Sequence, residues 1–356
     1  MSEPKASSKG GSLLLFLSPL TERTPTPKQS ESGEGGQITK KTKKGERPLR
    51  KTHALTEAAI ELALFAVLFL LALYAPVIGI VAALFLALPF MVFTMRHGWI
   101  PAMLLLAAAL VISGLIGSLL SLPMALMFGT VGMAVGAMLS KQKNRYLVLL
   151  VGALVFLANI VLDYIISIQF LHVDMIQDTL ALVRESFDTA MNLMKGMGQA
   201  PPLEMQRQFE QGLKLIGYMV PTLFVIASFA LAYATIIVSL PVMKRLKLPV
   251  GSWPPFRELM WPKTVLWLYV FVLLLSLFPF KEGSFAYIAV LNLSYVLQLA
   301  MIVQGFSFLY YAAYKKGVGK GVVAAGTVVC LFLPFLLYLV AIFGIIDLGF
   351  DLRRRI

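Results

Sequence analysis

Two long stretches of the 356-residue chain, residues 62–95 and 97–140, contain no Asp, Glu, Lys or Arg. An α-helix rises about 1.5 Å per residue and the hydrocarbon core of a bilayer is about 30 Å thick, so roughly 20 apolar residues cross it once. Each stretch is too long for a single crossing and must fold back on itself. The sequence therefore predicts a polytopic membrane protein built from α-helices.

The composition excludes a soluble domain. Hydrophobic residues make up 58% of the chain and charged residues 14%, and the mean hydropathy is +0.81, whereas about a quarter of the residues in a typical soluble domain are charged. The single cysteine, Cys330, lies in an apolar run. A lone cysteine excludes an intramolecular disulfide and argues against a thiolate metal cluster, so we predict no metal site.

A basic segment precedes the first apolar run. Residues 1–53 carry eleven Lys and Arg against five Glu, and the basic residues concentrate between Lys40 and Lys51. Such a segment is retained on the cytoplasmic side of a cell membrane and attracts anionic lipid. We therefore interpret residues 1–53 as a disordered basic cytoplasmic tail that contacts the lipid bilayer, and not as a nucleic-acid-binding arm.

Apolar runs predict an all-α bundle of eight or nine transmembrane spans. The expected spans cover residues 55–74, 77–95, 101–119, 123–139, 146–169, 218–240, 264–279, 284–314 and 321–345. Segment 170–216 holds six acidic and four basic residues, whereas segment 244–263 holds five basic and one acidic. The positive-inside rule places the first segment outside and the second in the cytoplasm. This divides the chain into a six-span bundle (54–243), a cytoplasmic basic loop (244–263) and C-terminal transmembrane helices (264–356).

The last apolar run has two interpretations. A straight crossing would leave Arg353, Arg354 and Arg355 outside the cell, against the positive-inside rule. Alternatively, Pro334 breaks the run into a re-entrant hairpin that returns the C-terminus to the cytoplasm. We favour the second interpretation.

The hydrophilic insertion at 172–216 carries the pattern of two amphipathic helices. Apolar residues recur at intervals of three and four, the spacing of one helix face: Ile176, Leu180, Val183, Phe187, Met191 and Met194, then Phe209, Leu213, Ile216 and Val220. A segment rich in Gly and Pro, residues 196–202, separates the two stripes. The pattern predicts an outer helical hairpin that acts as a lid, offers a partner surface or lies flat on the lipid.

Small residues at four-residue spacing mark the third and fourth spans, among them Gly132 and Gly136. Helices in a bilayer associate through close backbone approach, which small residues permit. We therefore expect these spans inside the bundle.

Few polar side chains fall inside the predicted spans. Asp163 lies one helical turn after Asn159, so the two share a helix face, and an ionised carboxylate facing lipid is costly. Asn292, Gln298 and Gln304 lie in the eighth span, where amides commonly hydrogen-bond between helices. We predict that these five residues line a ligand cavity within the bundle.

The chain contains no G-x-x-x-x-G-K-[ST] phosphate loop, no H-E-x-x-H zinc helix and no G-x-S-x-G nucleophile elbow. Its three histidines, His53, His97 and His172, are far apart in sequence. We therefore predict no enzymatic activity, no catalytic residue and no cofactor.

Several segments resemble the YybS-like family of bacterial membrane proteins, which carry a domain of unknown function. The resembling segments are LTEAAIELALFAVL from Leu55, PPFRELMWPKTVLWLY from Pro254, QGFSFLYYAAYKKG from Gln304 and GIIDLGFDLRRRI from Gly344. They span nearly the whole chain after residue 53. The resemblance implies a multi-pass protein of the cell membrane and assigns no biochemical activity.

The first six spans more distantly resemble the substrate-binding S-components of energy-coupling-factor vitamin transporters, six-helix bundles that open with a small-residue helix. The residues that carry this resemblance are Ala59 and Ala63, four apart on the first span. In those transporters a small-residue motif on the first helix docks a coupling protein driven by ATPases. The resemblance implies that Ala59 and Ala63 dock a separate coupling or ATPase subunit, although the large insertion and the spans after residue 243 depart from that pattern.

The sequence supports two functional hypotheses. In the first, the protein binds or takes up a small solute and has no energy source of its own. In the second, it is a non-transporting scaffold or regulator in envelope, division or sporulation processes, and it recruits partner proteins through its basic tail and outer hairpin.

Overall fold

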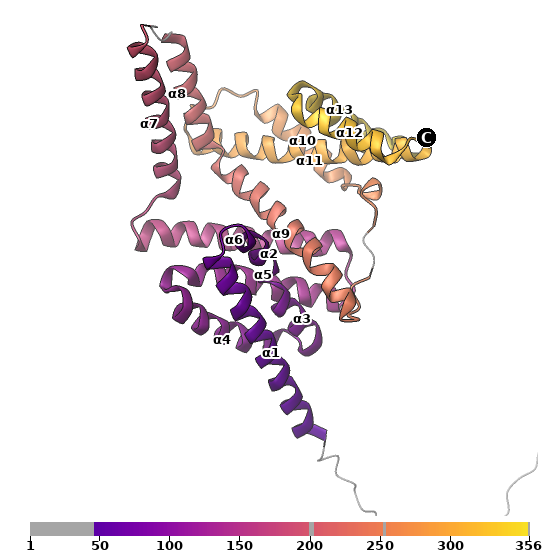
Figure 1. Cartoon of the computed structure of the whole chain (residues 1–356). Helices are drawn as coiled ribbons and strands as arrows, with labels where there is room; N and C mark the ends of the chain where they lie inside the picture. The colour runs from indigo at the N-terminus through magenta and orange to yellow at the C-terminus, as the bar shows by residue number, and fades with distance from the viewer. Residues whose placement is uncertain (1–45, 199–202, 252–253, 355–356) are drawn as a thin grey trace, which may run out of the picture. The chain divides into compact units, whose positions relative to one another are not determined.

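Every regular element in residues 46–198, 203–251 and 254–354, the part of the chain that the computed structural model describes, is a helix (Figure 1). Contacts divide the chain after Arg47, and residues 48–356 form one compact unit. The predicted disordered tail lies mostly outside the described residues. The α-helices are α1 (Glu46–Tyr74), α2 (Ile78–Phe85), α3 (Leu88–His97), α4 (Trp99–Gly117), α5 (Leu122–Ser140), α6 (Arg145–Phe170), α7 (Met175–Gly196), α8 (Leu203–Tyr218), α9 (Val220–Arg245), α10 (Lys263–Leu275), α11 (Phe285–Lys315), α12 (Lys320–Phe332) and α13 (Pro334–Phe350).

Seven helical segments among the described residues are long and apolar enough to cross a membrane, and the count rises to eight if α12 and α13 form one broken span. The polytopic helical bundle predicted from the sequence is therefore confirmed. Large apolar side chains on these helices remain exposed, for example Leu104 and Leu115 at 74% and 82%. In water such a surface would be unfavourable, but in lipid it needs no cover.

The prediction was wrong for the span expected at 264–279. The helix there, α10, has only 13 residues, which corresponds to about 20 Å at 1.5 Å per residue and is shorter than a bilayer core. The chain leaves the helix at Ser276 and turns through Lys281–Ser284 before α11 begins. Pro279 removes a backbone donor at this point and prevents continuation of the helix.

The predicted second span is also interrupted. It forms two helices, α2 and α3, with Pro89 in the first turn of α3. A proline is tolerated in a first turn because the N–H groups there have no partner within the helix. The break lets α3 pack deep in the bundle, where seven consecutive residues, 88–94, are buried.

A first hydrophobic core joins helices α1–α6 and α9. Phe65 of α1 packs edge-on against Phe90 of α3, with ring centroids 5.3 Å apart. The expected close approach of small residues occurs between α5 and α3: a Cβ atom on Gly136 would lie 2.7 Å from the Met91 carbonyl oxygen, and one on Gly132 would strike the Ala87 carbonyl oxygen. These glycines allow α3 and α5 to run side by side in the same direction, so both helices end together.

A second core joins α10, α11 and α13. Gly344 of α13 and Gly305 of α11 lie at the crossing, where a Cβ atom on Gly344 would come within 2.8 Å of the Gly305 nitrogen. Only glycine permits two helix backbones to approach this closely.

Helices α12 and α13 form a hairpin that bends by 118° at the break before Pro334. Thr327 of α12 hydrogen-bonds to the Tyr310 hydroxyl over 3.3 Å, and Arg353, just after α13, bonds to Ser307 over 3.0 Å. Both arms of the hairpin therefore lie along the C-terminal half of α11. The bend is compatible with both interpretations drawn from the sequence, a broken span and a re-entrant hairpin.

Basic residues from distant parts of the chain gather at one end of the bundle, which we call the basic end. The parallel course of α3 and α5 brings Arg96 and the α5–α6 turn to the same end. Gln142 in that turn donates a hydrogen bond to the Pro249 carbonyl, and Arg353 donates one to the Arg257 carbonyl over 2.7 Å. The basic end thus comprises Arg96–His97, the turn 141–144, segments 244–251 and 254–258, and Arg353.

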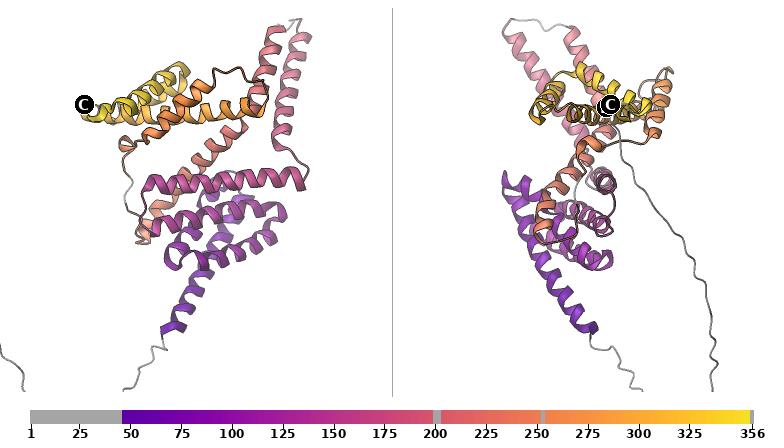
Figure 2. Two further views of the ribbon diagram at one scale, coloured as in Figure 1. Left: turned by 180° about the vertical axis from the view of Figure 1, so that it is seen from behind. Right: turned by 90° about the vertical axis from the view of Figure 1, so that its right-hand side faces the viewer.

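Helices α7 and α8 form the predicted hairpin at the opposite end, beyond the end of α6 (Figure 1). Figure 2 shows the two helices side by side, running crosswise to α6. The Phe187 and Phe209 rings stack with centroids 3.7 Å apart, and Arg184 pairs with Glu210. The amphipathic stripes therefore meet each other, which explains how a polar insertion forms two stable helices.

Candidate functional site

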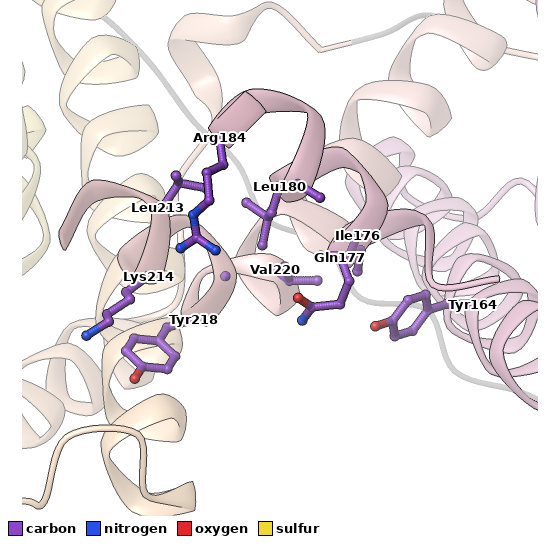
Figure 3. A pocket seen from close by; sticks show the side chains of 11 residues that line it. Tyr164, Ile176, Gln177, Leu180, Arg184, Leu213, Lys214, Tyr218 and Val220 are labelled. Atoms are coloured by element: carbon purple, nitrogen blue, oxygen red, sulfur yellow. The ribbon is translucent and has the colours of Figure 1, made fainter. Parts of the chain in front are cut away.

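A pocket of about 420 Å³ lies where the α7–α8 hairpin meets the end of α6 and the start of α9 (Figure 3). The volume falls within the range of about 300–1,000 Å³ that is typical of small-molecule sites. The lining residues are Tyr164, Ile176, Gln177, Leu180, Ala181, Arg184, Leu213, Lys214, Gly217, Tyr218 and Val220. They include five polar side chains and a larger apolar part.

Local helix signals position the α7 side of this pocket. Asp174 caps α7, and its Oδ1 accepts hydrogen bonds from the backbone nitrogens of Ile176 and Gln177 at 3.2 and 3.1 Å. The same oxygen lies 3.4 Å from the Tyr164 hydroxyl at the end of α6. A helix cap thus orients a tyrosine that lines the pocket.

The lining carries two cations and no carboxylate. Arg184 binds Glu210 outside the pocket through Nε (3.1 Å) and Nη2 (2.6 Å), and this hydrogen-bonded partner raises the pKa of the already basic Arg184. Lys214 is exposed and forms no ion pair within the described residues. In Figure 3 the Arg184 guanidinium and the Gln177 amide face the same space as Leu180. The arrangement suits a ligand with one anionic and one apolar part.

Two predicted cavity residues lie deeper in α6 than the pocket. Asn159 is 7% exposed and donates hydrogen bonds to Thr130 Oγ1 of α5 (3.0 Å) and to the Val155 carbonyl (2.7 Å). It therefore links two helices. Asp163 is partly exposed, has no hydrogen bond within the described residues and precedes Tyr164 of the pocket without lining it. Neither residue belongs to the pocket.

The amides of α11 have different environments. Asn292 Oδ1 accepts hydrogen bonds from the backbone nitrogen (2.9 Å) and hydroxyl (2.6 Å) of Thr222, in the first turn of α9, and its Nδ2 donates to the Tyr218 carbonyl over 2.7 Å. Asn292 thereby satisfies backbone groups at the α8–α9 junction. Gln298 is partly exposed and makes no hydrogen bond within the described part of the chain.

Gln304 belongs to a buried polar network in the second core. Its Nε2 donates to Asp347 Oδ2 over 2.6 Å, and its Oε1 accepts from the Trp261 backbone nitrogen over 3.0 Å. Arg353 completes the network with an Nε–Oδ2 distance of 2.9 Å to Asp347. Sequence reasoning missed Asp347 because it follows directly after the predicted last span. Its position in an apolar run was the signal that could have identified it.

Ala59 and Ala63 lie on an exposed face of α1, one turn apart. The side chains of α1 that enter the first core are instead Phe65 and Phe69, both fully buried. No other described helix therefore covers the two alanines.

Comparisons with known proteins agree with this architecture. Residues 63–348 match the family described as "Predicted membrane protein (DUF2232)". The chain is 30% identical over 309 residues to the Bacillus subtilis (strain 168) protein named "Uncharacterized protein YybS", and the match covers 86% of this chain and 100% of that protein. No solved structure matches the chain. The chain is an integral membrane protein that belongs to the DUF2232 (YybS-like) family.

Proposed function

We propose that the protein is a membrane-embedded binding or uptake component for a small anionic solute with an apolar part, and that it has no energy source of its own. The observation that supports this most is the pocket under the α7–α8 hairpin. Its lining combines Arg184 and Lys214 with the apolar residues Ile176, Leu180 and Leu213 and contains no carboxylate. Convergent polar groups in an otherwise apolar concavity are typical of small-molecule sites.

The distribution of charge supports an outer position for this pocket. We infer that the basic end faces the cytoplasm, because positively charged loops are retained there during insertion. The N-terminus, which precedes α1, would then be cytoplasmic as well. In this orientation the pocket opens to the outside, and a solute supplied there can reach Lys214 and Tyr218 without crossing the lipid.

The test uses the full chain in phosphatidylcholine nanodiscs, with phenyl phosphate as a water-soluble probe that carries both an anion and an apolar ring. Benzyl alcohol is the uncharged match. Since contacts to charged groups are worth about 1.5–3 kcal/mol before solvent screening, we expect Lys214→Gln to weaken binding of phenyl phosphate roughly three- to tenfold. Binding is measured by calorimetry.

Lys195→Gln is the matched control, because Lys195 is an exposed cation on α7 that does not line the pocket. Its affinity for phenyl phosphate should equal that of the natural chain. An equal loss of phenyl phosphate affinity in both variants would show that the probe responds to general surface charge. If the natural chain bound benzyl alcohol as tightly as phenyl phosphate, the result would contradict an anion site. Mass spectrometry of small molecules that co-purify from native membranes then identifies the natural solute.

A scaffold function is the second candidate, and the exposed pair Ala59 and Ala63 favours it. Small residues on an uncovered helix face permit close docking of another transmembrane helix. Under this hypothesis, Ala59→Leu with Ala63→Leu removes co-purifying envelope, division or sporulation proteins while phenyl phosphate binding persists, whereas ATPase subunits that co-purify with the natural chain would favour the uptake hypothesis. If the solute hypothesis holds, Lys214→Gln weakens phenyl phosphate binding and leaves the co-purifying proteins in place.

A further inference from the structure

Arg145 is a buried cation without a counter-ion in the described part of the chain. The residue is 6% exposed, and its Nη1 atom is fully buried with no hydrogen-bond partner. None of the described ion pairs involves it. A buried charge is strongly unfavourable unless it is paired. An anion that is not part of this chain would supply the missing partner.

The surroundings of Arg145 contain few acidic groups to compensate it. The sequence has no Asp or Glu between residues 62 and 162 or between 211 and 257, and these stretches supply both segments that meet at the arginine. Its Nη2 atom lies against Gly251, where any Cβ atom would strike it. The carboxylate of Glu258 acts electrostatically on the neighbouring Tyr146, but it is exposed and does not pair with Arg145.

A second donor beside Arg145 also lacks a partner. The Tyr146 hydroxyl oxygen is buried and makes no hydrogen bond within the described residues. The two residues are the first of α6, a helix of 26 residues whose amino-terminal end is capped by Asn144. The helix dipole concentrates partial positive charge at this end, which attracts anions. Arg145 and Tyr146 therefore each carry a buried polar atom without a partner in the first turn of α6, where the helix dipole is also positive.

The position of the site along the membrane normal identifies the anion. Arg145 is the first residue of a candidate span, Arg145–Phe170, and a crossing of the bilayer by this helix would put the residue at the level of the lipid phosphates. Exposed lysines surround it in the α5–α6 turn and after α9: Lys141, Lys143, Lys244 and Lys247. Basic pockets between transmembrane helices at this depth bind the phosphates of anionic head groups.

We propose that Arg145 and Tyr146, at the amino-terminal end of α6, bind a phosphate group at the basic end of the bundle, supplied by an anionic lipid. The site is separate from the pocket under the α7–α8 hairpin, and it does not depend on the solute hypothesis. Bound lipid would join the α5–α6 turn to segment 247–251, which the Gln142–Pro249 hydrogen bond already connects.

The experiment compares the full chain in nanodiscs of phosphatidylcholine alone and of phosphatidylcholine mixed with phosphatidylglycerol. Native mass spectrometry counts the phosphatidylglycerol retained on the released protein, and thermal unfolding measures the stabilisation. We expect Arg145→Gln to reduce retention about tenfold or more, because it removes a charge-assisted contact in a buried site. Lys195→Gln, which removes an exposed cation from α7 at the other end of the bundle, should reduce it less than twofold, as is usual for a screened surface charge.

Tyr146→Phe is the second variant, because it removes only the hydroxyl oxygen and preserves the ring, and we expect it to reduce retention as well. It decides the result if Arg145→Gln cannot be purified. Retention unchanged in Tyr146→Phe and, where it folds, in Arg145→Gln would overturn the proposal. Inorganic phosphate added to phosphatidylcholine nanodiscs tests the other source: saturable stabilisation there, without any effect of phosphatidylglycerol, would assign the site to a soluble phosphate and overturn the lipid assignment.

Discussion

Arg353 donates its Nε hydrogen to Asp347 Oδ2 over 2.9 Å, and the carboxylate is fully buried while the arginine side chain is 12% exposed. The same guanidinium donates to the Arg257 carbonyl and to Ser307 Oγ. Ser307 Oγ in turn lies 2.7 Å from the Leu259 carbonyl oxygen. One ion pair therefore fastens the C-terminal end of α13 to α11 and to the segment that precedes α10.

Removing one partner of this pair should destabilise the protein strongly. Arg353→Met leaves the Asp347 carboxylate buried without a cation, and such a change costs about 3–5 kcal/mol. The measurement is the midpoint of thermal unfolding in detergent. The exposed neighbour Arg354 supplies the control, and Arg354→Met should leave the midpoint unchanged. The double variant Asp347→Leu with Arg353→Met should recover much of the loss, and an equally low midpoint there would argue against the ion pair as the cause.

The crossing of α11 and α13 should not tolerate a methyl group. Gly344→Ala would push a Cβ atom into the Met301 carbonyl oxygen, and overpacking of this kind costs about 1–3 kcal/mol. Gly326→Ala on α12 is the matched substitution, because nothing lies within 4 Å of the added atom. We expect a lower unfolding midpoint for the first variant only. The same midpoint in both variants would be inconsistent with the close helix crossing.

Asn292 should hold α9 to α11. Asn292→Leu removes the acceptor for the Thr222 nitrogen and the donor to the Tyr218 carbonyl, and we expect a loss of about 1–2 kcal/mol, since interhelical hydrogen bonds in membranes are individually modest. Gln298→Leu on the same helix should have little effect on the unfolding midpoint. If Gln298→Leu were the more destabilising change, the role assigned to Asn292 would be wrong.

Labelling from outside intact cells should distinguish the two ends of the bundle. In a Cys330→Ser background, a membrane-impermeant maleimide is expected to label Arg207→Cys, an exposed position on α8. Lys247→Cys, exposed at the basic end, should react only after the cells are permeabilised, because basic loops are retained in the cytoplasm. The reverse pattern would invert the orientation and place the hairpin pocket inside the cell.

Local signals in the sequence predicted most of the helices. The absence of charge over 62–95 and 97–140 and the three-four spacing of apolar residues at 176–194 are properties of neighbouring residues, and the structure contains the expected helices there. The exceptions were the second span, which is divided into α2 and α3, and α10, which ends after 13 residues. The apolar run extended the predicted span to Pro279, because a hydropathy averaged over many residues does not show where the helix ends.

The candidate sites could not be predicted in the same way. Asn159 and Gln304 are both amides in apolar helices. Only the helices that pack against them decide that Asn159 bonds to Thr130 and that Gln304 bonds to Asp347. The sequence identified the hairpin that covers the pocket, but not the pocket itself. Its walls come from four helices, and their convergence depends on how the hairpin is placed.

The sequence by itself determined that this protein resides in a membrane, where most of its apolar helices lie and which loops are basic, because the cost of placing charge in lipid is decided residue by residue. The tertiary structure alone decided the partners of Asp347, the isolation of Arg145 and the shape of the hairpin pocket. These features depend on side chains that are far apart in the chain, since a buried charge is stabilised or left uncompensated by whichever helices pack against it.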